Sequence, residues 1–435
     1  MRRFKILAGT TFLLLVLFAA MALGVNKNET ALDSKTTAST LVEKKTIDPK
    51  LMAQHQALQK ELQLAVKTYF EKAISSGDII GAGVSIVKGD SILLVNGFGQ
   101  KSVGTKGKVD DETVFRLGSL SKGFTGVLTA DLKSEGKLNW QDKVSDYIPQ
   151  FQLGDESNTD KVRLAHILSH TSGTAYHSFT NLVEAGLSME KIAVRFDEVN
   201  PISEPGEMYS YQNAMFALSG EIVKKVTGNT ISVALQNRFF EPLGMSTACT
   251  DYETLIQNTN VALPHSKGRS GWKIRKLTDH YDNAVAAGGI NASSLDMAKW
   301  MRFLLGNNTD VMNESAIAEA FEPQVEINIG RKYYKKWPGH ISSAYAFGWR
   351  IHTFEDEVTK EKTTMWHHGG SVNSFRNEIA LLPDSDLGIC VLLNSNSRIA
   401  RTVIPDLQKI VEAIYAEVAL MSPHTPTETV SNSFE

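Results

Sequence analysis

The distribution of strand-like and helix-like segments along the chain is the feature that most restricts its possible folds. Short runs typical of strands lie at residues 83–87, 91–97, 345–352, 363–367, 374–382 and 387–393. The first two runs lie near the N-terminal end of this series and the other four near the C-terminus. Between these two groups, from about residue 117 to residue 305, the pattern is mostly helical and is broken at Pro and Gly. Strands joined by short turns pair antiparallel. We therefore expect an α/β protein of the α+β kind, with an antiparallel sheet built from both chain ends and a mostly α-helical inserted lobe.

Two long helices are expected to flank this sheet. Between residues 51 and 74, apolar side chains recur at helical spacing, at Leu58, Leu62, Ala65, Val66 and Phe70. Residues 402–420 fit a final helix, and the polar residues 421–435 are expected to form a loose tail. The folded domain is therefore predicted to span residues 51–420.

The N-terminal segment has the pattern of a leader. Arg2, Arg3 and Lys5 precede an apolar run at residues 6–25 that contains small residues. This is typical of a cleaved signal peptide, although a run of this length also just spans a bilayer as an uncleaved anchor. A buried core helix is the third reading. Residues 26–50 lack periodicity and resemble a flexible tether, so we expect an exported protein, periplasmic or anchored to the outer face of the cytoplasmic membrane.

Composition excludes several classes of protein. The 435 residues are 42% hydrophobic and carry 48 acidic against 45 basic side chains, which argues against a disordered chain and against a nucleic-acid-binding protein. The two cysteines, Cys249 and Cys390, are too few for a disulfide framework or a Cys-rich zinc site. Cys390 lies in a buried strand-like run, so two free thiols are expected.

The motif Ser-x-x-Lys is the strongest chemical candidate, but its spacing alone is not specific. It occurs five times, starting at Ser85, Ser119, Ser134, Ser188 and Ser270. Only Ser119 begins a helical run with a buried apolar stripe, and this places Lys122 one turn away on the same face. A partly desolvated lysine has a lowered pKa and can accept the proton of a serine nucleophile. The alternative is a helix-capping serine beside a surface lysine.

A serine nucleophile needs a second proton-transfer group. Tyr211 and Asn213 open another apolar helix after a Pro-Gly pair. A phenol beside an ammonium group is expected to be more acidic and to relay protons, and the Asn213 amide could hold a substrate carbonyl. A second Tyr-x-Asn begins at Tyr281, so the motif is not unique, and a tyrosine packed at a helix end remains the simpler reading.

Near the C-terminus, a His-His-Gly-Gly-Ser sequence from His367 to Ser371 leads into a predicted strand. Glycines at a strand edge allow a ligand to approach closely. A backbone N–H here could complete an oxyanion site with the N–H of Ser119. A metal is not expected at the two histidines, because no third ligand lies at a suitable spacing.

Several segments together resemble class C β-lactamases and their relatives, which include penicillin-binding DD-peptidases, D-aminopeptidases and esterases. Residues 115–128 are similar to the nucleophile helix of that superfamily, and His368 to Ser371 fall where lactamases have Lys-Thr-Gly-Ser. The other similar segments are residues 168–173, 211–213, 287–290, 296–298 and 347–349. The resemblance covers residues 51–420 and implies a β-lactamase/transpeptidase-like fold.

The resemblance also implies a mechanism. Ser119 would be the nucleophile, and Lys122 and Tyr211, rather than Tyr281, would share the proton transfers. The backbone N–H groups of Ser119 and Ser371 would hold the oxyanion, and an acyl-enzyme would form and be hydrolysed without metal or organic cofactor. Asn213, His368, Gly370 and Ser371 are the implied substrate-binding positions.

One departure from the lactamase pattern affects the expected substrate. His368 replaces a lysine that carries a permanent charge, whereas a histidine is mostly neutral at pH 7. Arg376 stands where the pattern has glycine, so we hypothesise that it supplies the charge for a substrate carboxylate.

Three functions remain open from the sequence. The first is β-lactamase-like amide hydrolysis, the second is hydrolysis of D-amino-acid peptides or small esters, and the third is a non-catalytic envelope binding protein. We expect a monomer that acts on a small molecule and not on nucleic acid.

Overall fold

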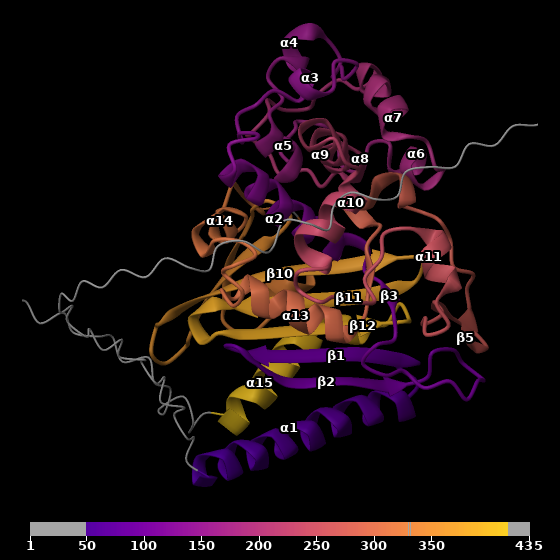
Figure 1. Cartoon of the computed structure of the whole chain (residues 1–435), viewed down its shortest axis with the longest axis vertical. Coiled ribbons are helices and arrows are strands. Elements are labelled where there is room, and N and C mark those ends of the chain that lie inside the picture. The colour runs from indigo at the N-terminus through magenta and orange to yellow at the C-terminus, as the bar shows by residue number, and fades with distance from the viewer. Residues whose placement is uncertain (1–48, 329, 331, 416–435) are drawn as a thin grey trace, which may run out of the picture. The chain divides into compact units, whose positions relative to one another are not determined.

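An eight-stranded antiparallel sheet forms the centre of the protein in a computed structural model, which describes residues 49–328, 330 and 332–415. The strand order is β2-β1-β12-β11-β10-β9-β8-β7 (Figure 1). The strands are β1 Gly81–Lys88, β2 Ser91–Gly99, β7 Val325–Glu326, β8 His340–Tyr345, β9 Arg350–Glu355, β10 Lys362–Val372, β11 Phe375–Leu382 and β12 Leu387–Leu393. Because β1 pairs with β12, with Val84 opposite Val391, the two chain ends are joined in one sheet, as predicted.

Most helices belong to the segment inserted between β2 and β7. The described α-helices are α1 Pro49–Ser75, α2 Ser121–Ser134, α3 Val144–Tyr147, α4 Glu156–Thr159, α5 Leu164–Leu168, α6 Thr180–Glu184, α7 Met189–Arg195, α8 Asn213–Ala217, α9 Ser219–Thr227, α10 Ile231–Leu235, α11 Tyr252–Gln257, α12 Val285–Gly288, α13 Ser294–Leu304, α14 Glu314–Glu319 and α15 Val403–Tyr415. Two small sheets interrupt this helical lobe and were not predicted. They are β3 Phe115–Arg116 with β6 Asn291–Ala292, and β4 His265–Gly268 with β5 Gly271–Ile274.

The sheet separates two apolar cores. Cys390 and Leu392 of β12 belong to the core shared with α2 and α13, whereas Val391 belongs to the core beneath α1 and α15. Successive strand residues point to opposite faces, and every residue of β12 is buried. This explains why residues 387–393 are continuously apolar and why their predicted bounds agree with the structure.

The N-terminal helix α1 is an integral part of the second core. The sequence predicts a helix at residues 51–74, and the structure has it at Pro49–Ser75. Its inward side chains Leu62, Val66 and Phe70 are fully buried, and the Phe70 ring stacks on Phe98 of β2 with 5.0 Å between ring centroids. The final helix, predicted at residues 402–420, corresponds to α15, which begins at Val403 and continues to Tyr415, the last described residue.

One predicted strand is wrong in its middle. Tyr345 ends β8 and Arg350–His352 begin β9, but residues 346–349 between them form a turn, in which Gly348 adopts φ +82°. A Cβ at Gly348 would overlap the Lys122 carbonyl, and the Trp349 ring lies against Gly123. The run is apolar because it packs on helix α2, and burial alone does not distinguish such a turn from a strand.

The predicted leader at residues 1–25, the tail at 421–435 and nearly all of the tether at 26–50 lie outside the described residues. Within the described part, no helix is both long and apolar enough to cross a membrane. Both cysteines are free thiols in the structure, as predicted.

Replacing Phe70 by alanine should destabilise the protein by about 3–5 kcal/mol, because it leaves a cavity in a closed core. The matched control on the same helix is Leu64→Ala, since Leu64 is 65% exposed and its loss should change stability by less than about 0.5 kcal/mol. Denaturant unfolding measures both variants. Equal stabilities would contradict the placement of α1.

Candidate active site

The segment that carries Ser119 is pressed against the end of β10. It is a 3-10 turn, Gly118–Leu120, that leads directly into α2. Gly118 has φ +58°, and a Cβ there would lie 3.0 Å from the Ser371 backbone nitrogen. A Cβ at Gly370 would overlap the Leu117 carbonyl oxygen. Glycine at both positions therefore allows the two backbones to touch beside the half-buried Ser119.

The structure brings the three predicted catalytic residues together. The Tyr211 hydroxyl donates a hydrogen bond to Ser119 Oγ at 2.8 Å, and Lys122 Nζ lies 3.3 Å from the same oxygen. Ser119 and Lys122 come from the start of α2, whereas Tyr211 immediately precedes α8. The arrangement satisfies the geometric requirement that a nucleophile lie within reach of its base.

The surroundings of Lys122 favour its neutral form. Its side chain is fully buried, and Nζ donates to Asn213 Oδ1 at 2.8 Å and to the Ala287 carbonyl at 2.6 Å. Burial, together with repulsion by Arg350, lowers the pKa of Lys122 well below its usual value. A neutral amine has two N–H bonds and one lone pair, so when Lys122 is neutral and donates to these two acceptors, its lone pair is left for Ser119 Oγ, 3.3 Å away.

The expectation that Tyr211 is more acidic than a free phenol is wrong. Burial raises the pKa of Tyr211 to about 12, although Arg350 and the hydrogen bond with Ser119 oppose the shift. The cost of burying a phenolate outweighs the nearby positive charge. Tyr211 is therefore a neutral proton donor near pH 7.

Asn213 and His170 fix the positions of the catalytic groups. Asn213 Nδ2 donates to the Tyr281 hydroxyl at 3.0 Å, while Oδ1 accepts from Lys122. One N–H of the amide is therefore left for a substrate carbonyl. The buried His170 accepts the Gln212 backbone N–H at 3.1 Å, and its ring lies 4.2 Å from the Tyr211 ring. The Tyr281 of the second Tyr-x-Asn thus holds Asn213 of the first, and His170 positions Tyr211.

Strand β10 presents an open edge beside Ser119. The sequence predicts that this strand ends at residue 367, but it continues to Val372. Strand β9 pairs only with residues 362–367, so beyond His367 the strand pairs with β11 alone. Gly370 and Ser371 therefore lie on a strand edge where an extended substrate can pair. The oxyanion role of the Ser119 and Ser371 N–H groups remains a prediction.

His368 does not supply the charge that the lactamase lysine carries. It is fully buried, with Nε2 2.9 Å from the Tyr345 hydroxyl and Nδ1 2.9 Å from the Gly369 carbonyl. Burial, and then repulsion by Arg350 and Lys122, lower the pKa of His368 well below its usual value. The imidazole is neutral, with Nδ1–H donating to Gly369 and Nε2 accepting from Tyr345.

The structure does not favour Arg376 as the group that binds a substrate carboxylate. Its guanidinium lies 3.1 Å from the carboxylate of the buried Glu378. Glu378 is opposite Gly369 in the sheet and is fully buried. The positive charge of Arg376 is directed at Glu378.

Arg350 is the cation that the sequence reasoning missed. It is half-buried at the start of β9, opposite His367. Its Nε has no hydrogen-bond partner, and no carboxylate in the described part of the chain forms an ion pair with it. Its charge acts on both Lys122 and His368. The available signal was its place directly after the Phe-Gly-Trp segment.

No group of three or more His, Cys, Asp or Glu side chains among the described residues is arranged to hold a metal ion. His367, which the sequence places beside His368, faces the other way and bonds Glu378 at 2.8 Å. The two neighbouring histidines therefore do not converge on one point.

The fold and the grouping of Ser119, Lys122 and Tyr211 define a protein of the β-lactamase/transpeptidase type. A family model described as Beta-lactamase matches residues 58–410, and the chain belongs to the beta-lactamase family. The family, together with its hydrolase neighbours, points to a hydrolase of the β-lactamase fold.

Two relatives illustrate the range of similar sequences. The chain is 27% identical over 379 residues to Protein flp of Staphylococcus aureus, covering 84% of this chain and 70% of that protein. It is 25% identical over 330 residues to the Unguisins hydrolase ungD' of Aspergillus campestris, covering 73% of this chain and 59% of the relative.

Two solved structures share the fold. A penicillin-binding protein homologue from Pyrococcus abyssi, described as octameric, has a TM-score of 0.67 and 22% identity, covering 82% of this chain and 80% of its own. EstCE1, described as a hydrolase with promiscuous acyltransferase activity, has a TM-score of 0.66 and 20% identity, covering 83% and 99%. The octameric relative gives no support to the expected monomer, which remains a prediction.

The hydrolytic rate should fall as pH decreases. Lys122 accepts a proton only when it is neutral, and its lowered pKa keeps it neutral to a lower pH than an ordinary lysine. Activity is therefore present above the pKa of Lys122 in the folded protein and lost as pH falls through it. The measurement is kcat/KM from about pH 5 to 9, with circular dichroism at each pH to exclude unfolding. A flat profile would contradict the role of Lys122.

Proposed function

We propose that the protein is an exported serine hydrolase that cleaves amide bonds in small anionic substrates, as β-lactamases do, through an acyl-enzyme on Ser119. The observation that carries this proposal is the pair of contacts on Ser119 Oγ, from Tyr211 at 2.8 Å and from the buried Lys122 at 3.3 Å. The proposal of export rests on the leader-like pattern of residues 1–25.

In the first step, the Ser119 hydroxyl proton moves to Lys122 Nζ while Oγ forms a bond to the substrate carbonyl carbon. The carbonyl oxygen becomes an oxyanion near the N–H groups of Ser119 and Ser371. As the tetrahedral intermediate collapses, the bond to the leaving group breaks, and the neutral Tyr211 donates its proton to that group. Tyr211 regains a proton from Lys122, whose Nζ lies 5.0 Å from the centre of its ring.

In the second step, water attacks the ester that joins the acyl group to Ser119. The Lys122 and Tyr211 pair accepts a proton from this water and returns one to Ser119 Oγ, so the enzyme recovers its starting protonation state. No step requires a metal or an organic cofactor.

The charges around the site support an anionic substrate. Besides burial, Arg350 lowers the pKa of Lys122, and Lys332 contributes to lowering the pKa of His177, whose ring lies near the Tyr211 ring. Arg350 has an unpaired Nε and no ion-pair partner among the described residues. The half-buried guanidinium lies 5.7 Å from the centre of the Tyr334 ring but faces no carboxylate among the described residues, so a substrate carboxylate is the anionic partner that we expect for Arg350.

A second candidate function is hydrolysis of a D-amino-acid peptide or a small ester on the same nucleophile. The neutral His368 favours it, because the permanent charge of the lactamase lysine is missing at this position. One experiment separates the candidates. The purified protein is assayed with a chromogenic cephalosporin, a D-Ala-D-Ala peptide and a short-chain aryl ester, with Ser119→Ala as control.

Cephalosporin turnover that Ser119→Ala abolishes supports the proposed function. Turnover of only the peptide or the ester supports the second candidate. Turnover that Ser119→Ala leaves unchanged would overturn both, as would a protein that hydrolyses none of the three, which would point to the non-catalytic binding protein.

Replacing Arg350 by glutamine should reduce kcat/KM for a carboxylate-bearing substrate about 10- to 100-fold, the factor expected for losing a charged hydrogen bond. Hydrolysis of a neutral aryl ester, compared on the high-pH plateau of each variant because Arg350 also lowers the pKa of Lys122, should change little. Arg376→Gln is the matched control, because its charge is directed at Glu378. If Arg376→Gln gave the selective loss and Arg350→Gln did not, the hypothesis drawn from the sequence would be restored.

A further inference from the structure

The segment from Thr278 to Asn291 forms the wall that holds the base. The Ala287 carbonyl accepts from Lys122 Nζ at 2.6 Å. The Tyr281 hydroxyl accepts from Asn213 at 3.0 Å, and Asn213 in turn bonds Lys122. Both acceptors of the Lys122 amine therefore depend on where this segment lies. The Ala287 carbonyl belongs to the segment, and Asn213 is bonded to it through Tyr281.

Little regular structure fixes the segment by itself. Residues 278–281 belong to no helix or strand, and Tyr281 adopts φ +72°. The only α-helix within the segment, α12, is a single turn, too short to be stable alone. Its position must therefore come from contacts with other elements.

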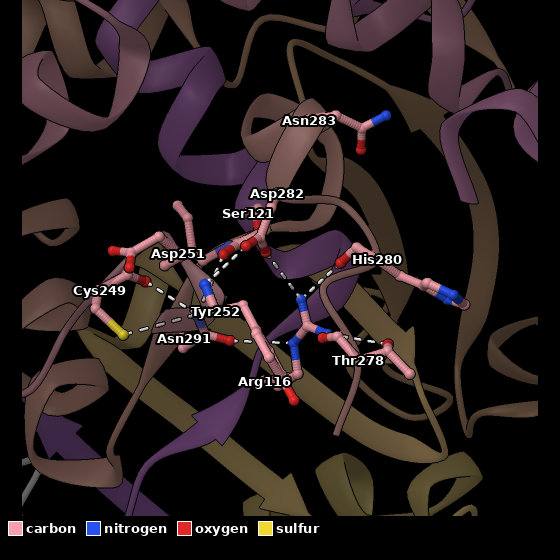
Figure 2. A network of polar contacts seen from close by, with 12 residues as sticks. Arg116, Ser121, Cys249, Asp251, Tyr252, Thr278, His280, Asp282, Asn283 and Asn291 are labelled. Carbon is pink, nitrogen blue, oxygen red and sulfur yellow. Dashed lines mark hydrogen bonds and ion pairs between the residues drawn. The ribbon is translucent and has the colours of Figure 1, made fainter. Parts of the chain in front are cut away.

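Arg116 makes such contacts at both ends of the segment, as Figure 2 shows. Its guanidinium donates to the backbone carbonyls of Thr278 and His280, the latter at 2.6 Å. Its Nε donates to Asn291 Oδ1 at 3.3 Å. The carboxylate of Asp282 lies 3.7 Å from the same guanidinium. A planar group with several fixed donors can satisfy all of these acceptors at once, which a lysine cannot do.

The backbone of Arg116 is held by strands β6 and β11. Arg116 lies in β3 directly opposite Asn291 of β6, and its carbonyl accepts from Asn377 of β11 at 2.8 Å. Three residues later the chain reaches Ser119. One side chain thus connects the strand that leads to the nucleophile with the wall that holds its base.

The burial of the charged Arg116 guanidinium indicates a role beyond filling space in the core. The Arg116 side chain is 1% exposed, and burial lowers its pKa, an effect that Asp282 opposes. Replacing a buried ion pair by apolar residues of similar volume is often neutral or stabilising. A purely structural filler at this position would not need a guanidinium, whereas an element that sets the position of two backbone carbonyls does.

We propose that Arg116 is a positioning residue for catalysis. It locks the segment from Thr278 to Asn291 against the strand before Ser119, and so keeps the Ala287 carbonyl where it directs the lone pair of Lys122 toward Ser119 Oγ. This inference rests on the proposed function of Ser119 and Lys122.

The test compares Arg116→Met with the wild type and with Arg238→Met. Arg238 is also paired with carboxylates, those of Asp131 and Glu135, but makes no hydrogen bond with the catalytic residues. Acylation of Ser119 is followed as kcat/KM across pH, and thermal unfolding is measured for each variant. Arg116→Lys, which keeps the charge but not the planar fork, should lie between Arg116→Met and the wild type.

We expect Arg116→Met to lower kcat/KM about 10- to 100-fold with little change in KM, since a misplacement of about 1 Å can cost this much. The acid limb of its pH profile should move to higher pH. A displaced wall admits water to Lys122, and the relief of its burial raises the pKa of that amine. Arg238→Met should change stability only.

The outcomes separate this inference from the proposed function. If the wild type forms no acyl adduct on Ser119, the proposed function fails whatever Arg116 does. If the wild type acylates and a folded Arg116→Met keeps the wild-type kcat/KM and pH profile, the positioning role is overturned. If Arg116→Met does not fold, Arg116→Lys is used instead, and an unchanged rate and pH profile for that variant would overturn the role equally.

Discussion

The fully buried amine of Lys122 is the constraint on which the rest of the site depends. Burying a cationic amine is unfavourable, so burial favours the neutral form of Lys122 and lowers its pKa. A neutral amine is useful only if its lone pair meets the serine, and the acceptors on Asn213 and Ala287 direct it there. Since these acceptors come from α8 and α12, the site requires the helical lobe to be assembled around α2.

The packing of α2 against the sheet explains how the lobe is held. Gly123 of α2 lies against the Trp349 ring, and Gly126 lies close to the Phe347 carbonyl. On the other side of the catalytic turn, Gly118 and Gly370 let the nucleophile segment meet β10. Glycine at these contacts allows backbone groups to approach where any side chain would separate them. Glycine at these four positions therefore allows α2 and the turn before it to pack directly on the sheet and on the loop between β8 and β9.

Much of this could be predicted from the sequence, because strands and helices leave periodic signals. The pattern predicts β12 to the residue and α1 within two residues, since both bury continuous apolar faces. The turn at Gly348 resembles a strand in sequence because its apolar residues pack on α2. The pKa of Tyr211 depends on burial and on neighbours distant in the chain, which no local pattern contains. Arg350 has one local signal, its place after the Phe-Gly-Trp segment, but its lack of an ion-pair partner among the described residues is a property of the fold.

The proposed mechanism requires that Ser119 carry the acyl group. The most direct measurement is mass spectrometry of the intact and digested protein after rapid quenching with a slowly hydrolysed β-lactam or an activated ester. The mechanism predicts a single adduct with the mass of the acyl group on the peptide that contains Ser119, and no adduct in the Ser119→Ala variant. An adduct on another serine, such as Ser188, or an equal adduct in Ser119→Ala would contradict it.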